Sequence, residues 1–170
     1  MDIKKLLIIA LVAVAVLSSA ATASAGLFDG FLMPGNGDNV VDIGPVTFNT
    51  TNVTVFKLNE TYPEEEFGAN FSTYMDDGDA CYTINILNGS VLNDSQFQNI
   101  YDDYKSWFEG NSSQTIDDVV VYTSSANVGE YKGETRYVAS VLNEDLKIFV
   151  DISTPDANET VKIAKSLKFN

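Results

Sequence analysis

Eight asparagines lie in the acceptor pattern of N-linked glycosylation, Asn-x-Ser/Thr with no Pro at the middle position. They are Asn49, Asn52, Asn59, Asn70, Asn88, Asn93, Asn111 and Asn158. Random placement of the same residues would give roughly two to three such tripeptides. The excess therefore predicts a chain that carries N-linked glycans. The alternative is that Asn, Ser and Thr occur together because all three are common in turns.

The acceptors are unevenly distributed along the chain. Seven lie between Asn49 and Asn111, and none occurs from Ser112 to Ala157. Either this stretch forms the centre of a sheet, where no sugar fits, or its exposed face is kept free for a partner. The sequence favours the first explanation, because two of the strands predicted there are apolar on both faces.

A second candidate for chemistry is the acidic turn Asp76, Asp77 and Asp79 around Gly78. Hard cations such as calcium prefer carboxylate oxygens presented by a tight turn. The spacing matches neither the twelve-residue calcium loop nor a glycine-rich repeat, so an unliganded turn is the alternative. Calcium is the one cofactor that the sequence suggests.

Catalytic chemistry is disfavoured by the complete absence of histidine. Ser-His-Asp and Cys-His nucleophile pairs, the usual zinc ligands and the commonest general base are all missing. Paired acids occur, but each pair is predicted on a turn or a solvated face. We therefore expect no enzymatic activity.

The net charge and the single cysteine limit partners and covalent links. The chain has 24 acidic and 10 basic side chains, a net charge of −14. Nucleic acids are excluded as partners, because their binding depends on basic side chains that neutralise phosphates. Cys81 cannot close a disulfide within one chain. It is either a small buried side chain or the site of an intermolecular bridge or a reactive thiol.

Residues 1–25 have the organisation of a secretory signal peptide. Lys4 and Lys5 precede the apolar run 6–17, and Ala23-Ser24-Ala25 forms a cleavage site of small residues. The sequence predicts a secreted or cell-surface protein without a stable transmembrane domain after cleavage. The alternative is a membrane tether formed by an uncleaved N-terminal segment.

Residues 26–44 are predicted to be a flexible tether, because 34–39 are rich in Gly, Asn and Asp. The tether begins with the apolar patch 27–33, which is able to contact a membrane or a partner or to dock on the domain. Residues 45–170 then form a single domain.

The pattern in this domain is four strands, a helix, three strands and a helix. Strands are predicted over 46–50, 53–58, 67–75, 81–87, 116–123, 135–142 and 146–153. In the last strand, Leu146, Ile148, Val150 and Ile152 are expected to point inward, and Lys147 and Asp151 outward. This order predicts an α+β fold, a mainly antiparallel sheet of about seven strands covered by two helices.

The first predicted helix begins at Asn93, Asp94 or Ser95 and ends at Gly110. Its aromatic and apolar residues recur at helical spacing, and a core role is favoured for them. The alternative is a ligand groove at Tyr101, Tyr104 and Trp107. The final helix is expected to start with a hydroxyl cap at Thr154 and with Pro155 at its first helical position.

Segments 48–54 (FNTTNVT), 119–124 (VVVYTS) and 155–160 (PDANET), with the lysine-led signal peptide, resemble small, sequon-rich exported proteins of methanogenic archaea. The resemblance implies a cell-envelope setting and no activity. The order of elements is loosely similar to the Mog1/PsbP-like fold, which would carry no function by itself.

Two functions are compatible with these observations. The first is a non-catalytic secreted or cell-surface glycoprotein module that contacts envelope proteins or other cell-surface components. The second is an extracytoplasmic module of Mog1/PsbP-like type that binds a small ligand or calcium. The first predicts a smooth domain, and the second predicts a cavity beside Tyr101, Tyr104 and Trp107.

Overall fold

The computed structural model describes residues 33–35, 38–51, 55–62, 70–76, 82–106, 111–126 and 133–170. The predicted signal peptide and the start of the predicted tether lie outside these residues. Within the described part of the chain, no helix is long and apolar enough to cross a membrane.

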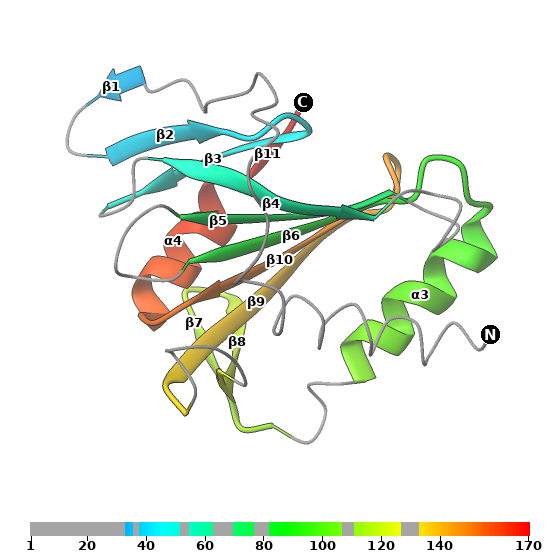
Figure 1. The fold of residues 1–170 in the computed structure, drawn as a ribbon. Coiled ribbons are helices and arrows are strands. Elements are labelled where there is room, and N and C mark those ends of the chain that lie inside the picture. The colour runs from blue at the N-terminus through cyan, green and yellow to red at the C-terminus, as the bar shows by residue number, and fades with distance from the viewer. Residues whose placement is uncertain are drawn as a thin grey trace.

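The described residues form two antiparallel sheets and two helices (Figure 1). The larger sheet has seven strands in the order β4-β5-β6-β10-β9-β8-β7. Its strands are β4 (Phe56–Tyr62), β5 (Asn70–Asp76), β6 (Thr83–Asn88), β7 (Ser113–Ile116), β8 (Val119–Ser125), β9 (Thr135–Asn143) and β10 (Ile148–Thr154). The predicted α+β fold is confirmed.

The smaller sheet has four strands in the order β1-β2-β3-β11. Its strands are β1 (Met33–Gly35), β2 (Asp38–Asp42), β3 (Val46–Thr50) and β11 (Lys168–Phe169). The helices are α3 (Asp94–Ser106), between β6 and β7, and α4 (Ala157–Ser166), after β10. Helix α4 ends directly before β11, so the C-terminus returns to pair with β3.

The core lies on both faces of the larger sheet, because successive residues of its central strands point to opposite sides. Val150 belongs to the cluster formed with the smaller sheet and α4, and the neighbouring Phe149 belongs to the cluster formed with α3. We call these sides the α4 face and the α3 face. The α4 face is closed by Val41, Val46 and Phe48 of the smaller sheet and by Ile163 of α4.

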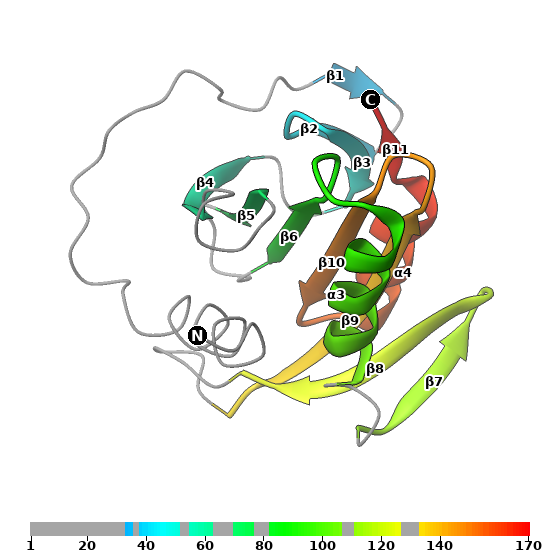
Figure 2. The same ribbon diagram turned by 90° about the vertical axis from the view of Figure 1, so that its right-hand side faces the viewer.

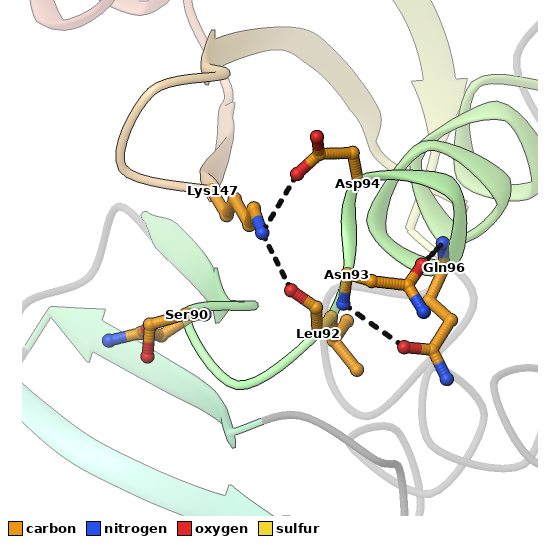
Figure 3. A network of polar contacts seen from close by, with 7 residues as sticks. Ser90, Leu92, Asn93, Asp94, Gln96 and Lys147 are labelled. Carbon is orange, nitrogen blue, oxygen red and sulfur yellow. Dashed lines mark hydrogen bonds and ion pairs between the residues drawn. The ribbon is translucent and has the colours of Figure 1, made fainter.

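Helix α3 begins with a reciprocal cap. The Asn93 side chain accepts from the Gln96 N–H at 2.9 Å, and the Gln96 side chain accepts from the Asn93 N–H at 3.1 Å (Figure 3). Lys147 Nζ donates to the Leu92 carbonyl at 2.7 Å and lies 2.9 Å from an Asp94 carboxylate oxygen. These contacts join the start of α3 to the turn before β10.

The predicted aromatic stripe of α3 is a core element in its first half. Phe97 and Ile100 are buried against Phe71, Leu87 and Phe149. A side chain at Gly89 would lie 2.5 Å from the Phe97 ring, so only glycine allows this approach. The helix is described as far as Ser106, and residues 107–110 lie outside the described part.

The predicted strand 116–123 is correct over 119–123, which belong to β8, but its start is wrong, because a turn separates β8 from β7. β7 and β8 are joined by Asp117 and Asp118, whose φ angles are 48° and 69°. Two positive φ angles are typical of the hairpin turn whose twist matches antiparallel strands. This turn was hard to predict, since Asp-Asp lacks the glycine that usually marks it.

The membership of the main sheet also differs from the prediction. Strand 46–50 has the predicted bounds, but it belongs to the smaller sheet. The prediction of a tether up to residue 44 is wrong for 38–42, which form β2 and pair with β3. Val41 and Ile43 are 1% and 5% exposed. This segment is ordered because those two apolar side chains complete the α4-face core.

The start of α4 differs from the prediction by two residues. The cap is Asp156, whose Oδ1 accepts from the N–H of Asn158 at 2.7 Å and of Glu159 at 3.4 Å. Thr154 instead ends β10, and its hydroxyl lies 2.9 Å from the Thr160 hydroxyl. Pro155 therefore precedes the cap and is not the first helical residue. A carboxylate is the stronger acceptor for the first N–H groups of a helix.

Two predicted side-chain orientations are wrong, one just before β10 and one within it. Leu146, expected inward, is exposed in the turn, and Lys147 has a φ of 52°, so the strand starts at Ile148. Asp151, expected outward, is 3% exposed. It is buried because β10 is a central strand covered on both faces.

Candidate functional site

The larger sheet splits where β8 leaves β9. The two strands pair only through Tyr122–Ser125 and Thr135–Val138. Continuing this register would place Val120 opposite Ser140, but these residues are not paired. The β7–β8 hairpin extends away from the rest of the sheet (Figure 2).

A cavity of about 580 Å³ lies at this split. We call it the hairpin cavity. α3 contributes Tyr101 and Lys105, and α4 contributes Ala164 and Lys165. The hairpin and β9 contribute Asp117, Asp118, Val119, Val120, Tyr122, Ser140 and Val141. Because α3 and α4 cover opposite faces of the sheet, the cavity is lined from both faces.

The lining combines aromatic, aliphatic and charged groups. Two lysines and two aspartates balance in charge, and Lys165 Nζ lies 3.8 Å from an Asp117 carboxylate oxygen. An ion pair of this length between exposed groups contributes little stability. The charged side chains therefore remain available to a bound molecule.

Only one of the three side chains of the predicted ligand groove belongs to the described part of the chain. Tyr101 lines the hairpin cavity, and its ring packs edge-on against Phe149 with 5.5 Å between centroids. The Tyr104 side chain and Trp107 lie outside the described residues. The sequence did not identify Lys105, Tyr122, Ser140 or Lys165, because they belong to four separate elements. The one feature of the sequence that pointed toward this region was the absence of glycan acceptors from 112–157.

Seven of the eight candidate glycan acceptors lie in the described part of the chain, and Asn52 lies outside it. None of the seven is buried: Asn49 and Asn88 are half-buried, and the others are exposed. Asn59 coincides with a shift of register between β4 and β5, and Asn70 begins β5. Asn59 therefore lies in the edge strand β4, and Asn70 lies in the neighbouring strand β5, opposite Asn88 of β6.

Three acceptor tripeptides also have structural roles. The Asn93 side chain caps α3, and the Asn88 side chain accepts from the Ser90 N–H at 3.1 Å. In the tripeptide of Asn158, the hydroxyl of the fully buried Thr160 donates to the Tyr137 carbonyl at 3.0 Å. Local structure alone accounts for these three patterns. Asn59, Asn70 and Asn111 are the exposed acceptors for which the structure gives no such role.

A smaller groove of about 420 Å³ adjoins the hairpin cavity and shares Asp117 and Lys165 with it. Asn49 and Asn158 both line this groove. The Asn49 N–H donates to the Ser166 hydroxyl at 2.8 Å, which holds β3 against α4. Asn49 of β3 and Asn158 of α4 therefore border the same groove.

The candidate calcium turn lies mostly outside the described residues, which include Asp76 but not Asp77, Asp79 or Cys81. Asp76 Oδ1 accepts from the Tyr82 N–H at 2.6 Å, so it joins the ends of β5 and β6. The described part of the chain contains no cluster of three or more His, Cys, Asp or Glu side chains. The calcium site stays a prediction.

A buried polar row crosses three strands on the α3 face. The Thr73 hydroxyl donates to Asn85 Oδ1 at 2.9 Å, and Asn85 Nδ2 donates to Asp151 Oδ2 at 3.2 Å. The row fixes the register of β5, β6 and β10, since each partner must stay opposite the next. On the other face, burial raises the pKa of the Tyr74 phenol above its ordinary value of 10.0.

No protein-family model, no curated protein and no solved structure matches this chain.

Proposed function

We propose that this chain is a non-catalytic glycoprotein module of the cell envelope, secreted or displayed at the cell surface, that acts by contact. The observation that carries the proposal is the position of the acceptors on the larger sheet. Asn59 lies in the edge strand β4 and Asn70 in its neighbour β5, whereas no acceptor occurs between Ser112 and Ala157. That acceptor-free stretch includes the β7–β8 hairpin and β9, which supply part of the lining of the hairpin cavity.

Glycans at the β4 edge would serve a physical need. An edge strand presents unpaired backbone N–H and C=O groups, which can form hydrogen bonds with a strand of another chain. Bulky sugars on Asn59 and Asn70 would block such pairing, and the net charge of −14 adds repulsion between copies.

The hairpin side is the complementary contact surface. Asn111 lies just ahead of β7, at the end of the hairpin opposite the Asp117-Asp118 turn. A sugar on Asn111 would therefore stay clear of the turn. Asn49 and Asn158 line the groove next to the cavity, so the proposed contact surface requires these two acceptors to be unmodified. The partners are envelope proteins or other cell-surface components, and the acidity argues against nucleic acid.

Mass spectrometry of the protein from its native source tests the glycan assignment. We expect sugars at Asn59, Asn70 and Asn111, and unmodified asparagines at all acceptors would contradict the proposal. N-terminal sequencing tests export, with Gly26 as the expected first residue. Recovery from the cytosol with Met1 retained would contradict export.

The hairpin cavity beside Tyr101 favours a second candidate function, the binding of a small ligand or of calcium. A thermal-shift screen with metals and metabolites tests it, because a ligand that binds only the folded chain raises Tm. Calorimetry with millimolar calcium tests the turn at Asp76, Asp77 and Asp79. The absence of heat would remove calcium from consideration.

A further inference from the structure

We propose that the split between β8 and β9 binds an extended peptide segment of a partner protein, which enters as an additional strand. The inference rests on the proposed function as a contact module and names the chemistry of the contact. It follows from the direction of the backbone groups at the split and from the lining of the hairpin cavity.

The direction of the backbone groups in β8 is set by its neighbours. Thr123 N–H donates to the Ser112 carbonyl at 2.8 Å, so residue 123 and its alternate residues face β7. Ala126 N–H donates to the Glu134 carbonyl at 2.8 Å, so the even-numbered residues face β9. Val120 therefore presents its N–H and C=O to the split.

The same alternation applies to β9. Val138 is the last residue of β9 in register with β8, opposite Tyr122. Ser140 is two residues further along and presents its N–H and C=O to β8, as does Leu142. In the described part of the chain, neither Val120 nor Ser140 has a register partner across the split. Val120 is 47% exposed, and Ser140 is also exposed.

The dimensions suit a short strand. The part of β8 that does not pair with β9, 119–121, has three residues, which pair only with β7 and span roughly 10 Å at the rise of a β-strand. The cavity volume of about 580 Å³ lies in the range of sites that enclose a ligand. Backbone donors and acceptors on both walls are what an added strand requires.

The lining indicates the side chains that such a segment would carry. Tyr101 and Tyr122 line the cavity from the α3 face, and Val141 and Ala164 line it from the α4 face. Successive side chains of an inserted strand would meet these two surfaces in turn. The expected peptide is extended, with apolar side chains that alternate between the two faces.

The test starts with a random octapeptide library displayed on phage and selected against the full exported protein. The affinity of one selected synthetic peptide is then measured by fluorescence anisotropy. Two variants at one position separate backbone from side-chain recognition. Ser140→Pro removes an N–H that faces the split, and Ser140→Ala removes only the hydroxyl.

We expect Ser140→Pro to weaken binding by about tenfold or more and Ser140→Ala by less than about threefold. Ser140→Pro leaves every hydrogen bond between β9 and β10 in place, because the Ser140 N–H faces the other side. Thermal unfolding of the variant checks this. If the variant does not fold, N-methylation of alternate peptide amides supplies the same test with the unchanged protein, and loss of binding is expected.

Three results would overturn the proposal. They are failure of the library to yield a binding peptide, equal binding to Ser140→Pro and the unchanged protein, or retained binding of every N-methylated peptide. Each leaves the glycan map untouched, so the proposed glycoprotein function fails only if the acceptors are also unmodified.

Discussion

The two edges of the larger sheet are built in opposite ways. The β4 edge has a register shift at Asn59, exposed acceptors, and an anchor in Phe56, which packs edge-on against Phe48 with 5.4 Å between ring centroids. The β7–β8 edge has an acceptor-free hairpin that separates from β9 and leaves Val120 exposed.

The two edges of one sheet can therefore differ both in how firmly they pack against the core and in how accessible their backbone is. Register shifts, charges and bulky groups are means by which proteins prevent edge pairing. At β4 the register shift coincides with a strong link to the core through Phe56. At β8 the strand is attached to the sheet through its second half only, and its first half lines a cavity. The proposed protection at one edge and the proposed access at the other would both follow from this topology.

The largest expected difference between the edges is in stability. Phe56 is 1% exposed and belongs to the α4-face core, so Phe56→Ala should lower the free energy of unfolding by about 3–5 kcal/mol. Val120→Ala truncates an exposed side chain at the other edge. It should change the free energy of unfolding by at most about 0.5 kcal/mol. Denaturant unfolding measures both. Equal losses would show that the hairpin is as tightly packed as β4.

The hairpin turn should show the next largest effect. Asp118 has a φ of 69°, a conformation that costs L residues with a branched side chain about 1–2 kcal/mol. Asp118→Val should destabilise by that amount, whereas Asp118→Gly should be neutral or stabilising. Thermal unfolding compares the pair. If Asp118→Val has no effect, the hairpin contributes nothing to the stability of the sheet.

Removing the candidate glycans should change association more than stability. Asn59→Gln combined with Asn70→Gln should leave unfolding within about 0.5 kcal/mol, since both side chains are exposed. The associated fraction in sedimentation velocity should rise, because the β4 edge is uncovered. Asn111→Gln, ahead of β7, is the control and should leave that fraction unchanged. A double variant as monomeric as the parent would contradict edge protection at β4.

The smallest effect concerns Tyr74, which lies in β5 opposite Leu58 of β4. Burial raises the pKa of its phenol in the folded chain above 10.0, so the unfolded chain loses the proton first as pH rises. Stability should therefore decline above pH 10, and Tyr74→Phe should reduce that decline. Unfolding measured at pH 7 and pH 11 checks this. An identical decline in the variant would show that the Tyr74 phenol has the same pKa in the folded and unfolded chains.

Patterns within single segments predicted most of the fold. The bounds of β3, the capped helix that begins near Asn93 and the central strands were visible because local spacing and turn residues determine them. The split of 116–123 into two strands was not visible, because Asp-Asp adopts its left-handed turn only when both strands pair. The burial of Asp151 likewise depends on Asn85, 66 residues away.

The sequence by itself determined the α+β class, the acidity, the absence of histidine and the positions of the acceptors. These are properties of composition and of local spacing, which need no partner in space. Tertiary structure alone decided that β3 joins a second sheet, that β8 leaves β9, and that Tyr101, Ser140 and Lys165 line one cavity. Long-range strand pairing and packing produce those results, and no short stretch of sequence encodes which distant strand it will meet.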